Sequence, residues 1–415
     1  MTGKTSRISG FYRLGGEERL GKVKEFADLT DEEVNNLKKG LSLELAEHMV
    51  ENVISTLKTP LGIAVNFLIN DRDYLIPMAT EESSVVAAAS NAAKICRLTG
   101  GFVATSTEPL MIGQIQLITP NPREAKKIIL GNKERILKIA NEQDPTLIRF
   151  GGGAVDLEVR ILKTKAGSMV ISHLLVDVRD AMGANIVNTM AEAVSPLIEE
   201  VTGGKTLLKI ISNYSVRRLS KAEVTVGKDE VGGEEVVDGI INAYEFAASD
   251  PYRAVTHNKG VMNGITAVAL ATGNDTRAVE AGAHAYAARD NGYKPLTTWE
   301  RDEKGDLRGC IELPLAVGII GGATMNPTAK TALKILGVES ARELSEVMAS
   351  AGLAQNLAAL RVLVSEGIQR GHMSLHARNI AVMAGARGED VDRISGILVK
   401  EKNIRVDRAK ELLNQ

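Results

Sequence analysis

The segment from residue 110 to residue 212 constrains the fold of this chain more tightly than any other stretch. Four of its parts read as short strands, and two have apolar residues at helical spacing. The six predicted elements are the strand 110–118, the helix 121–144, the strands 154–163 and 168–178, the helix 180–203 and the strand 206–212. This order, β-α-β-β-α-β, is the pattern of a split βαβ, ferredoxin-like unit.

The rest of the chain predicts a second, larger body around this unit. Short helices are expected over 25–58, and an Ala-rich helix starts at Glu81 and Glu82. The Ala- and Gly-rich character of that region resumes after the unit, so the unit is an insertion. Beyond 235 the chain reads as mostly helical, with a last long helix over 350–370. We predict an α+β protein with a large, mainly helical domain (1–108 and 214–370), an inserted ferredoxin-like domain (109–213) and a small C-terminal helical flap (371–415).

Composition excludes several classes of function. The formal net charge is -2 and only 3% of residues are aromatic, which argues against nucleic-acid binding. No apolar run approaches the roughly 18 residues that cross a bilayer, and the first residues lack the apolar core of a signal peptide. The two cysteines lie far apart in sequence and are expected to be reduced. We therefore expect a cytoplasmic protein without membrane or nucleic-acid partners.

One strand-to-helix junction has the features of an anion site. In "DAMGAN" (180–185) a strand ends, a glycine permits close backbone approach, and a helix begins. The amides and dipole at that helix start favour an anion such as a dinucleotide pyrophosphate, although a simply capped helix has the same pattern. Neither a P-loop nor a GxGxxG fingerprint occurs in the chain.

Chemically active side chains are scattered among small residues elsewhere. Glu82 reads either as a helix-dipole carboxylate or as a general acid kept neutral by burial. Lys259 reads as a solvated lysine or, held by Asp275, as a cation for an oxyanion. His372 follows a helix-stopping glycine at the start of the flap and is free to act as a mobile acid. No HExxH or Cys/His cluster is present, so no metal is expected.

Several long motifs together resemble those of the 3-hydroxy-3-methylglutaryl-CoA (HMG-CoA) reductase family, in its class II branch of mostly bacterial and archaeal members. They run in the expected order from about residue 45 to the end. The motifs are "ENVIS" (51–55), "PMATEESSVVAAAS" (77–90), "DAMGAN" (180–185), "THNKGVMNG" (256–264), "ATGND" (271–275), "VGIIGGATMNP" (317–327) and "GIQRGHMSLHARNIA" (367–381).

The resemblance implies an enzyme that interconverts HMG-CoA and mevalonate plus CoA by two nicotinamide hydride transfers, as in isoprenoid biosynthesis. It implies a helical substrate domain, an inserted cofactor domain and a mobile flap. It also implies a homodimer whose active sites lie at the subunit interface, assembled further into hexamers.

The resemblance also assigns roles to individual residues. The catalytic residues are Glu82, Lys259, Asp275 and His372, the substrate contacts are Ser84, Arg253, Asn263 and Asn213, and the cofactor contacts are Asp180, Met182, Gly183 and Asn185. In this scheme Lys259 stabilises the oxyanion, Glu82 supplies a proton to the aldehyde, and His372 protonates the CoA thiolate.

Asp144 in "ANEQDPTL" matches an acidic position of NAD-preferring family members. A carboxylate there would bond a ribose 2′-hydroxyl and repel a 2′-phosphate, so we predict NADH, with NADPH as the alternative. The competing interpretation is an ordinary Asp before Pro145 at a helix end. Two functions from other classes stay open: a metal-dependent hydrolase using His257, Asp275 and His284, and a non-catalytic, effector-binding regulatory protein.

Overall fold

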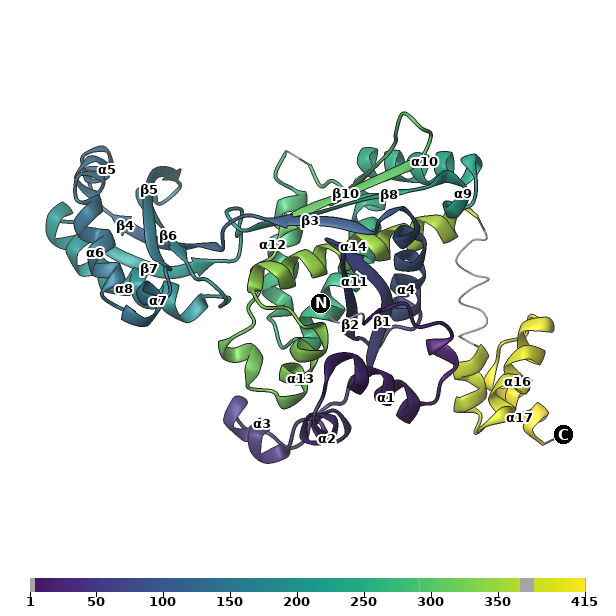
Figure 1. The fold of residues 1–415 in the computed structure, drawn as a ribbon. Coiled ribbons are helices and arrows are strands. Elements are labelled where there is room, and N and C mark those ends of the chain that lie inside the picture. Colours follow the sequence, from purple (N-terminus) through teal and green to yellow (C-terminus); the bar gives the residue numbers. More distant parts are fainter. Residues whose placement is uncertain (1–3, 291, 366–376, 415) are drawn as a thin grey trace.

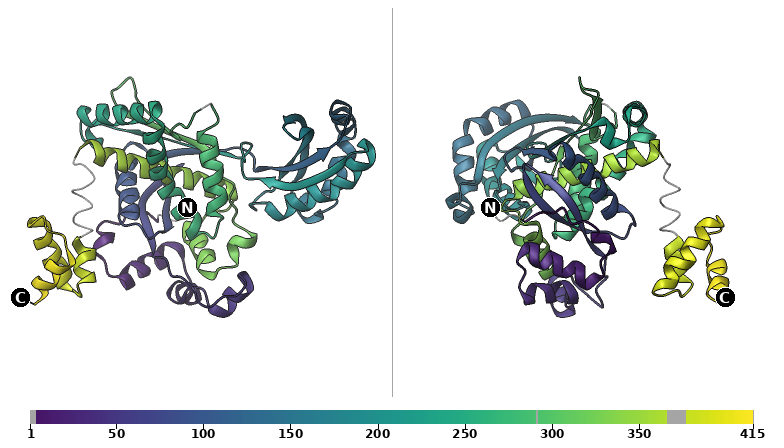
Figure 2. Two further views of the ribbon diagram at one scale, coloured as in Figure 1. Left: turned by 180° about the vertical axis from the view of Figure 1, so that it is seen from behind. Right: turned by 45° about the vertical axis from the view of Figure 1, so that its right-hand side comes forward.

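The computed structural model describes residues 4–290, 292–365 and 377–414. They form two β-sheets with helices packed on them and a separate group of C-terminal helices (Figures 1 and 2). The smaller sheet and its helices project to one side of the larger part, and the C-terminal helices lie at the opposite side. The predicted α+β class is confirmed.

The larger part is built on a six-stranded sheet of order β2-β1-β3-β8-β10-β9. Its strands are β1 (Leu61–Ile69), β2 (Arg72–Ala79), β3 (Phe102–Ser106), β8 (Leu219–Val226), β9 (Thr297–Arg301) and β10 (Leu307–Pro314). β3 was not predicted, and neither were the last three strands, because the chain after 214 was expected to be mainly helical. β8 buries every second residue along "LSKAEVTV", whereas the charges on β9 and β10 obscure their pattern.

Helices cover this sheet. They are η1 (Phe11–Arg13), α1 (Gly16–Ala27), α2 (Asp31–Lys39), α3 (Leu43–Met49), α4 (Val85–Cys96), η2 (Arg97–Thr99), α9 (Lys228–Val231), α10 (Glu234–Ser249), α11 (Pro251–Ala271), α12 (Thr276–Ala287), η3 (Gly321–Thr324), α13 (Pro327–Leu336) and α14 (Ala341–Val364). The first predicted helices thus end at Met49, and the last long helix starts nine residues earlier than expected, with the predicted stop at Gly371 outside the described residues.

Two glycines bring the core helices α11 and α14 close together. A Cβ at Gly264 would lie 2.8 Å from the carbonyl oxygen of Ala351, and one at Gly352 would lie 2.7 Å from Ile265. Only glycine permits this approach, which fixes α11 against the core. Among the described helices α14 alone is long and apolar enough to span a bilayer, but most of it is buried as a core helix.

The smaller sheet has the order β5-β6-β4-β7, with all pairs antiparallel. Its elements are β4 (Leu110–Ile118), α5 (Pro122–Gly131), α6 (Lys133–Asn141), α7 (Pro145–Arg149), β5 (Gly153–Thr164), β6 (Gly167–Asp177), α8 (Ala184–Thr202) and β7 (Lys205–Ser212). The connectivity matches the predicted β-α-β-β-α-β order. The helix expected over 121–144 is interrupted at Asn132, whose side chain donates to the Ile128 carbonyl at 2.8 Å while its backbone leaves helical geometry.

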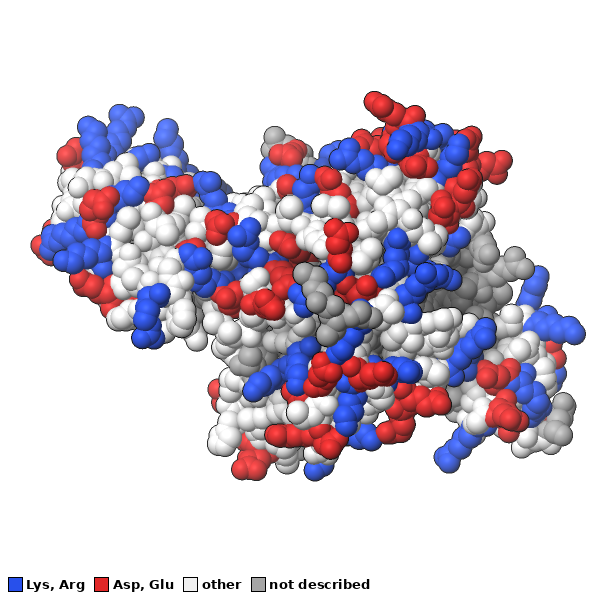
Figure 3. All heavy atoms as spheres, viewed as in Figure 1, with Lys and Arg blue, Asp and Glu red and all other residues white. Residues whose placement is uncertain are grey.

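The C-terminal helices α16 (Glu389–Lys400) and α17 (Val406–Leu413) share a small apolar core of their own, which includes Ile394, Leu398 and Leu412. Positive and negative side chains are intermingled over the face seen in Figure 3, without a stripe of one sign. This distribution agrees with the net charge of -2.

Candidate active site

The turn between β2 and α4 carries Glu82. β2 ends at Ala79 and α4 begins at Val85, so Glu82 precedes the helix and does not stand in its first turn as expected. The Glu82 amide donates to Thr80 Oγ1 at 3.1 Å. Ser84, the residue before the helix, has a φ of 74°, which non-glycine residues adopt only when their surroundings impose it. The turn therefore holds Glu82 clear of the helix.

Lys259 on α11 meets this turn directly. Its Nζ lies 2.5 Å from Glu82 Oε2, and Asn263, one helical turn later, donates Nδ2 to the same oxygen at 3.3 Å. The Glu82 side chain is 39% exposed, so it is not buried in this structure as the expectation from sequence required.

A cavity of about 210 Å³ opens beside this pair. Its walls come from the end of β2, the following turn, α11 and α12, and they are Ala79, Thr80, Glu81, Glu82, Lys259, Met262, Asn263, Thr266, Ala267, Leu270, Glu280 and His284. We call it the catalytic pocket below. An ammonium, an amide and carboxylates thus converge on one small space, the arrangement needed for proton transfer and oxyanion stabilisation.

A second charged pair lines the same pocket. Glu280 lies on α12, and its Oε1 accepts a hydrogen bond from Thr266 Oγ1 at 2.6 Å. Its Oε2 lies 2.9 Å from His284 Nε2. His284 Nδ1 lies 2.6 Å from the Tyr293 hydroxyl, and the two rings stack. Burial raises the pKa of the Glu280 carboxyl, but the bonds from His284 and Thr266 outweigh it and bring the pKa below the ordinary value. Glu280 is therefore a charged carboxylate.

Asp275 does not hold Lys259 as predicted. It is the N-cap of α12, and its Oδ1 accepts the amides of Arg277 at 3.0 Å and Ala278 at 3.1 Å. Its nearest cation in the described part of the chain is Arg277, at 3.5 Å. Asp is a preferred capping residue, so the local sequence accounts for this position.

Two other predicted substrate contacts, Arg253 and Asn213, do not line the pocket. Arg253 is half-buried on α11, burial lowers its pKa, and no ion-pair partner is found for it among the described residues. Asn213 is exposed after β7, with its backbone carbonyl against Gly282 of α12. His372 lies outside the described residues.

His257 faces the core on the opposite side of α11. It is 2% exposed, its Nε2 lies 2.6 Å from Thr297 Oγ1 and 3.1 Å from Asn356 Nδ2, and burial lowers its pKa to about 4. The trio of His257, Asp275 and His284 does not converge, and no cluster of metal-ligating side chains occurs in the described residues. A metal-dependent hydrolase is therefore not supported.

The predicted cofactor junction begins α8. Gly183 is the N-cap, with φ 96°, and a Cβ there would lie 2.5 Å from Val178. No side chain caps α8, so the amides at its start are open to an anion. Asn185 is exposed on the first turn. The junction is therefore not a helix capped by its own side chains.

A tight seam joins this junction to the larger part. Asp180 Oδ1 accepts the Ala341 amide at the start of α14, at 2.8 Å, and the Asp180 carbonyl accepts the Ile319 amide at 2.9 Å. A Cβ at Gly318 would lie 2.6 Å from the Met182 nitrogen, while the Gly318 amide donates to Asn274 Oδ1 at 2.7 Å. Residues 318–319 thus connect the cofactor junction to the turn that carries Asp275.

Asp144 lies at the end of a helix, as its competing interpretation predicted. It is the N-cap of α7, with Pro145 as the first helical residue, and its Oδ1 accepts the Leu147 amide at 2.9 Å. The second carboxylate oxygen makes no hydrogen bond within the described residues. Asp144 therefore caps a helix and also retains one oxygen for a ligand.

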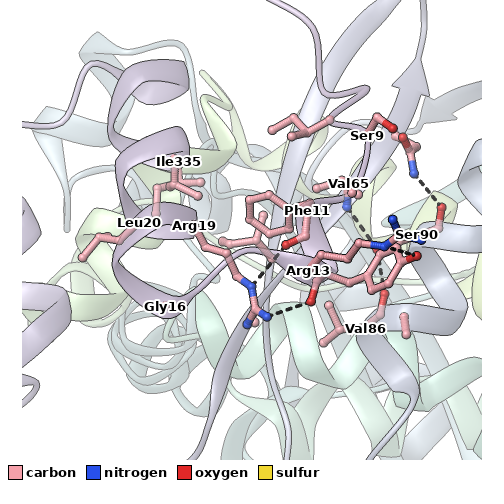
Figure 4. A pocket seen from close by; sticks show the side chains of 18 of the residues that line it. Ser9, Phe11, Arg13, Gly16, Arg19, Leu20, Val65, Val86, Ser90 and Ile335 are labelled. Carbon is pink, nitrogen blue, oxygen red and sulfur yellow. Dashed lines mark hydrogen bonds between the residues drawn. The ribbon is translucent and has the colours of Figure 1, made fainter. Parts of the chain in front are cut away.

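A larger cavity of about 1000 Å³ lies between the N-terminal segment and α4 (Figure 4). Val86, Ala87, Ser90, Asn91 and Lys94 of α4 form one wall. Its walls carry five cations and no acidic residue; the cations are Arg7, Arg13, Arg19, Lys38 and Lys94. Arg19 is fixed by hydrogen bonds to the carbonyls of Phe11 and Tyr12, at 3.2 and 3.0 Å.

Reasoning from sequence missed this cavity, the seam and the role of Glu280. Four of the cations come from residues 7–38 and the fifth, Lys94, from α4, and only the fold brings these two segments together. Arg218 was also missed: it is 4% exposed, donates to the carbonyls of Ala181 and Val317, and has its pKa lowered to about 10 by burial. No local motif distinguishes it from a surface arginine.

The chain matches known proteins along nearly its whole length. The family model described as hydroxymethylglutaryl-coenzyme A reductase matches residues 16–377. The 3-hydroxy-3-methylglutaryl-coenzyme A reductase of Archaeoglobus fulgidus is 60% identical, over 99% of this chain and 95% of that protein. A probable reductase of the same name from Borreliella burgdorferi is 36% identical, over 88% and 84%.

Solved structures agree with these matches. The 3-hydroxy-3-methylglutaryl-coenzyme A reductase of Streptococcus pneumoniae superposes with a TM-score of 0.84 at 40% identity, covering 98% of this chain and 99% of that one. A class II structure from the same organism, bound to NADPH in open conformations, gives 0.82 at 41%, covering 97% and 99%. The chain therefore belongs to the HMG-CoA reductase family, and its reaction is the reduction of HMG-CoA to mevalonate.

Proposed function

We propose that the reduction takes place at the catalytic pocket, with Lys259, Glu82 and Asn263 as the residues that touch the reacting carbonyl. The observation that carries this proposal is the 2.5 Å contact between Lys259 and Glu82 beside a cavity. A cation next to a proton-exchanging carboxylate is the combination that carbonyl reduction requires. The reaction is that of the family, and the contact between Lys259 and Glu82 supports assigning it to this pocket.

The bound nicotinamide supplies the hydride in each of the two steps. Lys259 then stabilises the negative charge that develops on the carbonyl oxygen, a contribution of roughly 3 kcal/mol or more. Asn263, which bonds Glu82 in the free enzyme, keeps that carboxyl oriented toward the same oxygen. The Glu82 carboxyl, which lies beside Lys259, donates the proton that the carbonyl oxygen receives.

Further residues complete the proposed site. Arg253, without an ion-pair partner in the described chain, holds the distal carboxylate of the substrate. Ser84 and Asn213 contact the same end of the substrate. His372 on the flap protonates the departing thiolate. Asp275 caps α12 in this structure, and its catalytic role is proposed on the family motif alone.

The N-terminal cavity receives the CoA portion of the substrate. Five cations without a carboxylate suit its phosphates. α4 runs from the Glu82 turn past Lys94 to Cys96, and its 12 residues rise about 18 Å, which leaves room for the extended arm of CoA. The cavity thus lies along the helix that follows the Glu82 turn.

The cofactor binds at the start of α8, where Asp180, Met182, Gly183 and Asn185 surround open amides. We assign NADH, because the free oxygen of Asp144 suits a ribose hydroxyl and opposes a 2′-phosphate. The S. pneumoniae relative is described with NADPH, so the comparison supports a nicotinamide cofactor and leaves the choice to Asp144.

A homodimer completes the site. Ile54 is 93% exposed and Leu57 97% exposed, and their segment is tied to the Glu82 turn by a 3.1 Å bond from the Thr80 amide to the Pro60 carbonyl. Tyr252 at the start of α11 is 87% exposed as well. Such apolar exposure beside a reaction pocket suits coverage by a second copy, with hexamers as the further assembly. Light scattering on the purified protein measures the assembly.

The free cysteines Cys96 and Cys310 suit a reducing cytoplasm. The direct test is a spectrophotometric assay of nicotinamide oxidation with HMG-CoA and of nicotinamide reduction with mevalonate and CoA, each with both cofactors. We expect turnover in both directions, faster with the non-phosphorylated cofactor. A preference for NADPH would remove the role of Asp144, and no turnover would remove the assignment of the pocket.

A further inference from the structure

Glu280 and His284 have no role in the family assignment, yet they line the catalytic pocket. Both are on α12, and their side chains are only 35% and 40% exposed. Their contact is also fixed on both sides, by Thr266 on Glu280 and by Tyr293 on His284. A charged pair that merely solubilised the surface would not be held in this way.

The geometry on α11 places this pair next to Glu82. Asn263 bonds Glu82, and Thr266, three residues later on the same helix face, bonds Glu280. Side chains three residues apart on a helix are about 5–6 Å apart. The two carboxylates therefore reach neighbouring positions of α11 from opposite walls of one small pocket.

We infer that Glu280 and His284 form a charge-setting pair, which fixes how tightly the catalytic pocket holds the proton that Lys259 and Glu82 give to the substrate. The inference rests on the proposed function of that pocket. When the His284 imidazole is protonated, the pair is neutral and the carboxylate of Glu280 is balanced.

The groups that face this pair come from every element around the pocket. The turn before α4 presents Glu81 and Glu82, and α11 presents Lys259 with the uncharged Asn263 and Thr266. The residue after α12 that contacts the pair is Tyr293, whose pKa burial raises, so it stays neutral. Apart from the Glu280–His284 pair itself, Lys259 is therefore the one cation in the described pocket wall. Few other charges there can offset a change of charge on α12.

Charge removal at the two residues has opposite consequences. Without the negative charge of Glu280, the pocket holds its proton less tightly; without the positive charge of His284, it holds the proton more tightly. A residue needed only for folding would give no such opposition. Together the two variants separate an electrostatic role from a structural one.

The test uses the pH dependence of kcat for reduction of free mevaldehyde by the full-length enzyme. In E280Q the midpoint at which activity is lost with rising pH should fall by about one unit, and in H284Q it should rise by a similar amount. The double variant E280Q/H284Q should return to the wild-type midpoint. The matched control H48Q, at an exposed position on α3, should superpose on the wild type.

Equal midpoints in all variants, or shifts of the same sign, would overturn the inference. If a single variant does not fold, the titration of the His284 imidazole in Lys259→Ala gives the reciprocal measurement by NMR. Loss of the ammonium should raise that midpoint, and an unchanged midpoint would contradict the coupling. A wild-type enzyme inactive with both mevaldehyde and HMG-CoA would instead refute the proposed function, so the two failures are distinguishable.

Discussion

The catalytic pocket and the cofactor junction at α8 are built in opposite ways. In the pocket, side chains from several elements converge, as Lys259, Asn263 and Glu82 do within 3.3 Å. At the junction the working groups are backbone amides, and the decisive residues, Gly183 and Gly318, contribute by having no side chain. The first site is thus built from side-chain groups and the second from backbone space.

This difference predicts that truncating a side chain in the pocket lowers the turnover of the enzyme. Lys259→Ala should lower kcat by roughly 100- to 1000-fold with both HMG-CoA and mevaldehyde, because an oxyanion loses its preorganised donor. Steady-state kinetics with each substrate measure the effect. Lys22→Ala, on an exposed pair of α1, is the matched control and should behave as the wild type. Near-normal turnover in Lys259→Ala would remove the contrast between the regions.

At the cofactor junction, adding a side chain should instead weaken cofactor binding. Gly183→Ala places a Cβ 2.5 Å from Val178 at a φ of 96°, so the amides at the start of α8 must shift. We expect KM for the nicotinamide cofactor to rise about tenfold, a loss of about 1.4 kcal/mol in binding, with a smaller change in KM for HMG-CoA. Gly131→Ala, in the same part of the fold but with open space around it, is the control. An unchanged cofactor KM would contradict the proposed junction.

Asp275 allows capping and chemistry to be separated. Asn is as good an N-cap as Asp, so Asp275→Asn should keep the thermal stability of the protein, whereas Asp275→Ala should cost about 1 kcal/mol. If Asp275 also acts in catalysis, the Asn variant loses activity while remaining stable. Thermal unfolding and kinetics of both variants give the comparison. Full activity in the Asn variant would restrict Asp275 to the cap.

The smallest expected effect concerns cofactor choice. Asp144→Ala removes the proposed 2′-phosphate repulsion, so the ratio of kcat/KM for NADH to that for NADPH should fall several-fold. The same change removes a helix cap, which lowers activity with both cofactors alike. The ratio therefore isolates specificity, and an unchanged ratio would show that Asp144 only caps α7.

The contrast also explains what could be predicted from sequence. The strands of the smaller sheet were found because their polarity alternates strongly, while the break at Asn132 depends on a single side-chain bond that no periodicity reveals. Glu82 and Lys259 stand in long recognisable motifs, so their meeting could be expected. The exposure of Glu82, the capping contacts of Asp275 and the contact between Glu280 and His284 could not be predicted. They depend on where α12 and the β2–α4 turn lie in space.

The most direct test of the account is the turnover of Glu82→Gln with HMG-CoA and with free mevaldehyde. Gln keeps the size of the side chain and can still bond Asn263, but it cannot supply a proton to the substrate oxygen. We predict a loss of roughly 100-fold or more in mevaldehyde reduction and a comparable loss in overall HMG-CoA reduction. Near-normal turnover with both substrates would contradict the assignment of the Lys259–Glu82 pair as the chemical centre.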